Sequence, residues 1–349
     1  MKKLEKKQTV NVKELKEVLR IVRPGLGDGN SIEQSNSFAF VNNKVVTYND
    51  QICITHPVIN LNLTGAVNAD NLYKLLDRLD VKEVSMTIEG PQVLIKAGSR
   101  KAGLQIQEDI KLPLGAVEEV SILDTKNTKW KKLPIDFLSA LDFALPVCST
   151  DFSQLILTCI NVGNEIVSTD GFRILRQSLS SELPVKGFLL PGSVVKTLVA
   201  ISPNEIYKTD KWVYFRKDTG AIIGCRIVEG TFPEINTHFI TKGTKIVFPK
   251  QTLDVIETAR IFSDAKFEYQ EMVEVHILNG VAEISSRSET GWYKEKVKVD
   301  CKKGELEFQI TPILFRHILK QTQKCLWGQN KIQFRGDNWK HVIALRSNN

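Results

Sequence analysis

A helix-start pattern occurs six times along the chain, and this internal repetition constrains the fold more than any other feature of the sequence. VNVKELKEVL begins at Val10 and VNADNLYKLL at Val67, so the asparagines Asn11 and Asn68 lie 57 residues apart. Apolar residues follow each asparagine at four, seven and eight places, which puts them on one face of a helix. Because asparagine favours the position just before a helix, both segments predict amphipathic helices.

Four later segments show the same pattern. They are LPIDFLSALDF from Leu133, LPGSVVKTLV from Leu190, FPKQTLDVIET from Phe248 and ITPILFRHIL around Thr311. Proline is tolerated in a first helical turn and threonine suits an N-cap, so each segment has an acceptable helix start. The two departures are Asp142 and Glu257, which place a carboxylate at the eighth position. The sequence therefore predicts six related helices.

Strand signals fill the intervals between these helices. FAFVNNKVVTY, LILTCINVGNEIVSTD and VEVHILNGVAEISS each contain two β-rich runs around an Asn or Gly turn, which is typical of a hairpin. One helix and about four strands make a half-unit, and two half-units make a unit of roughly 115–125 residues, a common size for a domain. The sequence therefore predicts an α+β protein of three similar domains, each an internal duplication, over residues 1–125, 126–243 and 244–349.

The helix faces opposite the apolar stripe are mostly basic. A helix lays its apolar face on a sheet, so its other face stays open. Asp136 and Asp142 make the third helix an exception. A solvated surface explains any single basic face, but five faces of one sign favour a shared surface for sequence-independent phosphate contact. The candidate DNA-binding residues are Lys13, Lys16, Arg20, Arg23, Lys74, Arg78, Lys196, Lys250, Arg316, Lys320 and Lys324.

Composition and missing motifs exclude several function classes. The chain is 42% hydrophobic and 25% charged, as in an ordinary soluble protein, and its net charge of +7 hints at a polyanionic partner. No apolar run approaches the roughly 18 residues of a membrane helix, and MKKLEKKQ is not followed by an apolar signal region. The six cysteines show no paired spacing, so we expect reduced thiols, no metal site and a cytoplasmic location.

No catalytic set stands out among the residues. The loop GLGDG (25–29) follows a helix rather than a strand, which is the wrong context for a dinucleotide fingerprint. Phosphate-loop and HExxH motifs are absent, and the five histidines are scattered over different repeats. We therefore expect no catalytic residue, no cofactor and no enzymatic activity, although an enzyme acting on nucleic acid stays open because catalytic groups also assemble across loops.

Four segments, in order, resemble one known family over essentially the whole chain. STDGFRIL (168–175), RIVEGTFPEI (226–235), ARIFSDAKF (259–267) and FLLPGSVVKTL are similar to stretches of the bacterial DNA polymerase III beta subunit, the sliding clamp. The identity is low, so the chain resembles a divergent member. The resemblance implies a head-to-tail homodimer that closes a ring around double-stranded DNA, with helices on the inner wall. It also implies a processivity factor that tethers a replicative DNA polymerase and is placed on DNA by a clamp loader.

The resemblance implies a pocket for clamp-binding-motif peptides of replication and repair proteins. The matching residues are Thr169, Gly171, Phe172, Arg173, Ile174, Pro233, Val342, Ile343, Ala344 and Leu345. Phe172 replaces a histidine of the family, and the ending HVIALRSNN departs from the family's ending, which leaves the register of the last strand open. The alternative is that these residues merely close a junction between domains.

Two further features bear on assembly. Ile261 and Phe262 match an apolar pair that lies in the family's dimer interface, although ordinary core at a helix end explains them equally well. The positive net charge departs from a family that is usually acidic. A monomeric clamp homologue that binds clamp-motif peptides and regulates replication without encircling DNA is therefore an alternative to the ring.

Overall fold

The fold was determined from a computed structural model, which describes residues 8–113, 129–240, 242–263, 265, 270–328 and 330–346. The predicted boundary at residues 125 and 126 lies outside these residues. The chain forms two compact units: unit 1 comprises Met1–Asp142 and Ser181–Glu229, and unit 2 comprises Phe143–Ser180 and Gly230–Asn349. Each unit is described by itself.

An α-helix follows each of the six predicted starts. The α-helices are α1 (Val12–Val22), α2 (Ala69–Asp77), α4 (Phe137–Ala144), α5 (Val195–Ile201), α6 (Thr252–Arg260) and α7 (Pro312–Leu319), and the 3₁₀ turns are η1 (Arg23–Gly25), η2 (Leu145–Val147), η3 (Phe152–Thr158), η4 (Gly192–Val194) and η5 (Asn236–His238). The two predicted asparagine caps are formed: side-chain Oδ1 of Asn11 accepts from the backbone amide of Glu14 at 3.1 Å, and Oδ1 of Asn68 accepts from that of Asn71 at 3.0 Å. These bonds satisfy amides that the helix itself leaves unpaired.

The strands are antiparallel wherever they pair. Unit 1 contains β1 (Gln8–Asn11), β2 (Ser37–Val41), β3 (Lys44–Tyr48), β4 (Ile52–Pro57), β5 (Gly65–Asn68), β6 (Glu83–Glu89), β7 (Gln92–Ala97), β8 (Arg100–Gln107), β9 (Lys131–Lys132), β13 (Phe188–Pro191), β14 (Glu205–Lys208), β15 (Trp212–Arg216) and β16 (Ile222–Arg226). Unit 2 contains β10 (Cys159–Val162), β11 (Glu165–Thr169), β12 (Arg173–Ser178), β17 (Thr244–Val247), β18 (Val273–Leu278), β19 (Val281–Ser288), β20 (Gly291–Lys298), β21 (Asp300–Cys301), β22 (Glu305–Ile310), β23 (Lys324–Gly328), β24 (Lys331–Arg335) and β25 (Trp339–Ala344). The predicted hairpins are present: Asn42 and Asn43 take positive φ between β2 and β3, as do Asn279 and Gly280 between β18 and β19.

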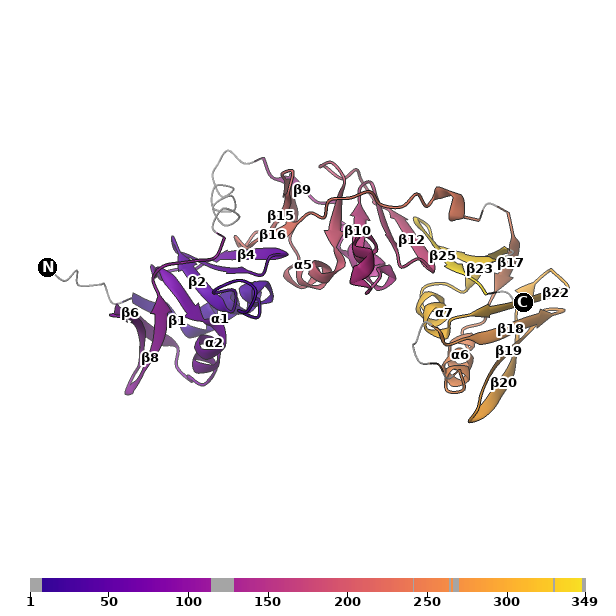
Figure 1. The fold of residues 1–349 in the computed structure, drawn as a ribbon, viewed down its shortest axis with the longest axis horizontal. Helices are drawn as coiled ribbons and strands as arrows, with labels where there is room; N and C mark the ends of the chain where they lie inside the picture. The colour runs from indigo at the N-terminus through magenta and orange to yellow at the C-terminus, as the bar shows by residue number, and fades with distance from the viewer. Residues whose placement is uncertain are drawn as a thin grey trace. The chain divides into compact units, whose positions relative to one another are not determined.

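In unit 1 one twelve-stranded sheet runs in the order β1-β6-β7-β8-β5-β2-β3-β4-β16-β15-β14-β9. The pairing of β4 with β16, from Thr55 opposite Ile222 to Ile52 opposite Cys225, joins strands that lie about 170 residues apart in the chain. Helices α1 and α2 pack side by side on this sheet (Figure 1). Leu15 and Leu19 of α1 and Leu72 and Leu76 of α2 are buried, so the predicted apolar faces form the core.

In unit 2 the strands follow the order β10-β11-β12-β25-β24-β23-β17-β21, and a four-stranded sheet runs β20-β19-β18-β22. Helices α6 and α7 pack against each other beside these sheets (Figure 1). The centre of the core is aromatic: the ring of Phe315 on α7 meets Phe248 edge-on at 5.2 Å and Phe334 of β24 at 6.1 Å between centroids. Such contacts add to the free energy gained from apolar burial.

A pair of histidines, one buried and one half-buried, lies next to this core. His341 of β25 is fully buried, and neither of its ring nitrogens has a hydrogen-bond partner among the described residues. Its ring lies 6.3 Å from that of His317 on α7, which in turn contacts Phe143. Burial, followed by the charges of Arg173 and His317, lowers the pKa of His341 well below its usual value. The protein therefore holds this imidazole in its neutral form.

We predict that the pKa of His341 makes unit 2 sensitive to acid. The unfolded chain takes up a proton on this residue below a pH of about 6.5, whereas the folded chain does not, so the free energy of unfolding falls as the pH drops. In His341→Phe the free energy of unfolding should fall less steeply with decreasing pH, by up to about 1.4 kcal/mol per pH unit. Denaturant unfolding at several pH values between neutral and about pH 5 measures it. Phe143→Leu alters the same cluster without removing an ionisable group, so its free energy of unfolding should depend on pH as in the parent. If His341→Phe also kept the parent's pH dependence, His341 would not be the group responsible.

Candidate functional site: an apolar pocket in unit 2

The segment STDG forms a tight turn between β11 and β12, and its hydrogen bonds fix the side chains around it. The Asp170 carboxylate accepts from the backbone amides of Phe172 and Arg173, both at 3.0 Å, and from Nε of Arg173 at 2.8 Å. Gly171 has φ +88°, a conformation that strains other residues. With the turn held in this way, the ring of Phe172 projects outward and is 52% exposed.

Two other segments complete the walls of the site. β25 pairs with β12 so that Val342 lies opposite Ile174, and the amide of Ala344 donates to the carbonyl of Phe172 at 2.8 Å. The segment from Pro233 to Ile240 crosses over β24, where the side chain of Gln333 bonds both backbone groups of Ile240, at 2.8 and 3.2 Å. These contacts bring three stretches that are distant in sequence around one hollow.

The hollow is a mainly apolar pocket of about 570 Å³. Eight of the ten predicted pocket residues line it: Thr169, Gly171, Phe172, Arg173, Ile174, Pro233, Val342 and Ala344. The other two, Ile343 and Leu345, lie in the core of unit 2 instead. The reason is the period of a strand, because alternate side chains of β25 point to opposite faces of the sheet.

Six lining residues were missed by the sequence analysis: Leu157, Glu234, Ile235, His238, Asn330 and Lys331. Lys331 donates to the carbonyl of His238 at 2.8 Å, and thus ties β24 to the segment that closes the pocket. Arg176 does the same from β12, with a hydrogen bond to Asn236 at 2.9 Å and its guanidinium 4.2 Å above the ring of Phe239. Glu234 and Ile235 belong to the quoted segment RIVEGTFPEI, whereas no local pattern distinguished the other four.

The predicted DNA-binding residues all lie at the surface, but five of the eleven form ion pairs within their own unit. Lys16 of α1 donates to Asp77 of α2 at 2.6 Å, which raises the pKa of Lys16 and lowers that of Asp77. The other four pairs are Arg20 with Glu17, Lys74 and Arg23 with Asp70, and Arg316 with Glu257. Carboxylates on the same helix or on a neighbouring one therefore neutralise part of the basic surface.

The remaining six predicted residues form no ion pair among the described residues. They are Lys13, Arg78, Lys196, Lys250, Lys320 and Lys324, and each is exposed. Lys13, Arg78 and Lys196 belong to unit 1, and the other three belong to unit 2. These six are the charges that each unit leaves available to an anion.

The predicted interface pair lies where α6 ends. Ile261 is 70% exposed, whereas Phe262 is half-buried. The Phe262 ring packs on Gly291 at the start of β20, so close that a Cβ at this glycine would stand 3.0 Å from a ring carbon. Ile261 is therefore an apolar side chain without cover in unit 2, and Phe262 is partly core.

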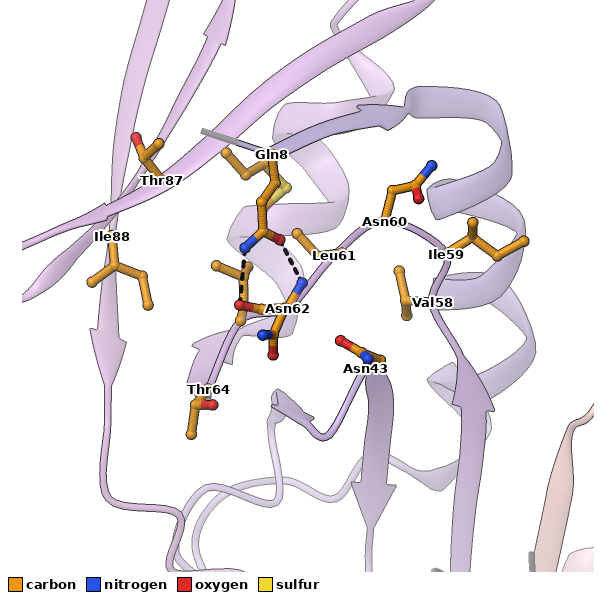
Figure 2. Close-up of a pocket in the computed structure, with 12 residues that line it drawn as sticks. Gln8, Asn43, Val58, Ile59, Asn60, Leu61, Asn62, Thr64, Thr87 and Ile88 are labelled. Carbon is orange, nitrogen blue, oxygen red and sulfur yellow. Dashed lines mark hydrogen bonds between the residues drawn. The ribbon is translucent and has the colours of Figure 1, made fainter. Parts of the chain in front are cut away.

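A second groove, of about 920 Å³, lies in unit 1 (Figure 2). The side-chain amide of Gln8 reaches the backbone of Asn62 at its centre, where its Nε2 donates to the Asn62 carbonyl at 3.1 Å (Figure 2). Asn43, Asn60, Thr64 and other neutral residues line the rest, and no charged residue of the described chain does. With neither charge nor an enclosed apolar surface to select a ligand, this groove is a weaker candidate than the pocket of unit 2.

The structure was also searched for metal sites and membrane spans. No cluster of three or more potential metal ligands occurs among the described residues. Within the same part of the chain, no helix has the length and apolarity needed to cross a bilayer.

Comparisons with known proteins bear on the fold. No protein-family model matches the sequence, and no curated protein does. Solved structures do match, over nearly the whole of both chains. The DNA polymerase III subunit beta of Pseudomonas aeruginosa covers 98% of this chain and 100% of its own, with a TM-score of 0.83 and 16% identity. The sliding clamp of Bacillus subtilis covers 99% and 100%, with a TM-score of 0.83 and 18% identity.

A third match supports the same fold. The beta subunit of Thermotoga maritima gives a TM-score of 0.79 at 15% identity and covers 98% of this chain. The α+β fold class that the helix and strand repeats predicted is confirmed, and so is the resemblance to the sliding-clamp family. The chain thus has the three-domain fold of the DNA polymerase III beta subunit, the bacterial sliding clamp.

Proposed function

We propose that the protein is a DNA sliding clamp, a non-enzymatic processivity factor that acts in the cytoplasm. The observation that carries the proposal is a match to solved sliding clamps over 97–99% of this chain, at TM-scores near 0.8. Exposed, unpaired cations such as Lys13 on α1 and Lys320 after α7 support contact with DNA phosphates. Because a ring is retained by topology, a few weak contacts are sufficient.

The partners follow from the two surfaces of unit 2. We infer that the apolar pocket takes short peptides of a replicative polymerase, a clamp loader and repair proteins. Phe172 supplies an exposed aromatic anchor, the kind of residue that dominates binding energy at interfaces. Exposed Ile261 supports a homodimer in which this residue and Phe262 lie at the contact between copies. A monomeric, peptide-binding homologue stays the alternative, because exposed lysines on β20 and the exposed Arg100 and Lys101 on β8 would repel each other if these two strands met between copies.

We predict topological retention on DNA. The protein is incubated with a linear duplex that is fixed at one end, the free end is blocked with a bulky protein, and the support is then washed with salt. A ring should remain while the end is blocked and leave when the block is cut away, because escape then needs only sliding. Equal loss with and without the block would contradict encirclement. A mass of one chain at micromolar concentration, together with that result, would favour the monomeric homologue.

We predict that the unpaired lysines dominate the electrostatic contact with DNA. Lys13→Glu with Lys196→Glu and Lys320→Glu should weaken duplex binding and reduce the slope of log affinity against log salt by about 0.9 for each lost phosphate contact. In the matched control, glutamate replaces Lys186, Lys211 and Lys242, which are exposed but do not belong to a helix. Equal losses in the two variants would show that only net charge matters and that the helix faces are not the contact.

We predict that Phe172→Asp weakens a peptide carrying the clamp-binding motif at least tenfold, or about 1.4 kcal/mol, because a carboxylate beside an apolar pocket must be desolvated when the peptide docks. Fluorescence anisotropy measures the affinity, and the chain mass should not change. Phe152→Asp is the matched control, since Phe152 is 70% exposed in the same unit but does not line the pocket. Unchanged affinity in Phe172→Asp would place the peptide elsewhere.

A further inference from the structure

A stretch of unpaired backbone forms one wall of the groove in unit 1 (Figure 2). Residues 61–63 lie just before β5, and their side chains alternate as in a strand: Leu61 and Leu63 are buried, whereas Asn62 between them is exposed. Among the described residues, the backbone groups of this stretch form no hydrogen bond except two at Asn62, both with the side chain of Gln8. The stretch therefore has the form of a strand that lacks a neighbouring strand.

The side chain of Gln8 takes the place of a strand partner for Asn62. Its Nε2 donates to the Asn62 carbonyl at 3.1 Å, and its Oε1 accepts from the Asn62 amide (Figure 2). In an antiparallel ladder, two residues that lie opposite each other exchange the same pair of hydrogen bonds. The Gln8 amide thus imitates one peptide group, and the backbone of an incoming chain can take over its two bonds.

The facing wall is also backbone that lacks a partner on one side. β6 extends to Glu89, but its pairing with β1 ends where Gln8 lies opposite Met86. Thr87 and Ile88 line the groove beyond that point (Figure 2), and within the described part of the chain no strand pairs with them on the side of β1. A groove of about 920 Å³ is thus bordered by two stretches of backbone that can bind an extended chain.

The lining residues determine which kind of chain fits. No charged residue of the described chain lines the groove, so a charged side chain would lose its hydration there without gaining an opposite charge. The polar part of the lining consists of amides and hydroxyls, such as those of Asn43, Asn60 and Thr64, which hydrogen-bond to neutral groups. Ile59, which is 72% exposed, offers a contact for an apolar side chain. An uncharged, extended segment satisfies all of these features.

Two other occupants fit less well. The chain's own residues 1–7, MKKLEKK, directly precede Gln8, and a continuation of β1 in the same register would bring Lys6 and Lys7 alongside β6. Those two ammonium groups would find no carboxylate in the described lining of the groove. Nucleic acid needs cations to neutralise its phosphates, and the same lining has none. A neutral segment of another protein is therefore the better match.

We propose that this groove in unit 1 is a docking site for an uncharged, extended segment of another protein. The segment displaces the side chain of Gln8, pairs its backbone with Asn62 and the residues beside it, and packs one apolar side chain on Ile59. This inference does not depend on encirclement of DNA. It uses neither the apolar pocket lined by Phe172 nor the proposed contact between copies.

The test uses the full chain and a labelled nine-residue peptide of alternating threonine and valine, whose binding is followed by fluorescence anisotropy. The parent should bind this peptide, and peptides with lysine or glutamate in place of threonine should bind at least tenfold more weakly. Gln8→Ala should strengthen binding of the neutral peptide roughly fivefold, because the peptide no longer competes with the Gln8 amide.

A charge placed in the groove should reverse the preference. Thr64→Lys should weaken binding of the neutral peptide and strengthen binding of the peptide with glutamate in place of threonine. Thr219→Lys is the matched control, since Thr219 is exposed in the same unit but does not line the groove, and it should behave as the parent does. Equal effects of the two substitutions would place the peptide elsewhere.

Four further results would overturn the proposal. A neutral peptide that binds no more tightly than about 1 mM would show that the groove does not select such a segment. Undiminished binding of both peptides that are N-methylated at alternate amides, one for each edge of the strand, would show that no strand is added. Weaker binding by Gln8→Ala would show that Gln8 builds the site instead of standing in for a partner. Tenfold tighter binding after removal of residues 1–7 would assign the groove to the chain's own N-terminal segment.

Discussion

Antiparallel strand pairing between distant parts of the chain is the interaction on which the site depends. β12 and β25 lie about 165 residues apart in sequence, yet their register sets Ile174 opposite Val342. Without that ladder Val342 and Ala344 would not lie beside the TDG turn, and β12 would be an unpaired edge of the β10-β11-β12 sheet. The pairing of β24 with β25 then brings Gln333 beneath the Pro233–Ile240 segment, where its amide replaces a missing strand partner for Ile240. The pocket therefore exists only because β12, β25 and β24 pair in one sheet. The alternation of side chains along β25 determines which of its apolar residues line the pocket.

On the helix surfaces, ion pairs formed by the fold neutralise part of the positive charge. The sequence places Lys16 on α1 and Asp77 on α2, 61 residues apart, and only the packing of these helices brings them to 2.6 Å. Exposed pairs of this kind contribute little to stability, about 0–1 kcal/mol, so their effect is mainly on the field outside the protein. Each pair removes a cation from the set available to phosphate. The remaining lysines suit weak and movable contact better than tight binding.

Periodicity predicted most of the fold because helices and hairpins are local. The Asn11 and Asn68 caps, the α1 and α2 faces and the Asn-Asn turn at 42–43 follow from side chains within eight residues of one another. Site prediction was less complete for a physical reason. Strand alternation was sufficient to separate Val342 and Ala344 from Ile343 and Leu345 once the register was known, but the register depends on a partner strand far away in sequence. Lys331 and His238 line the pocket through such long-range contacts, and no local pattern marks them.

The positions of the positive charge bear on the assembly. Lysines on an open strand discourage pairing between identical chains, which protects a long edge from aggregation. On β20 the same lysines stand beside Trp292 and close to Phe262, which packs on Gly291. Salt screens the repulsion between these lysines and other cations, so we expect the contact between copies proposed at Ile261 and Phe262 to depend on ionic strength.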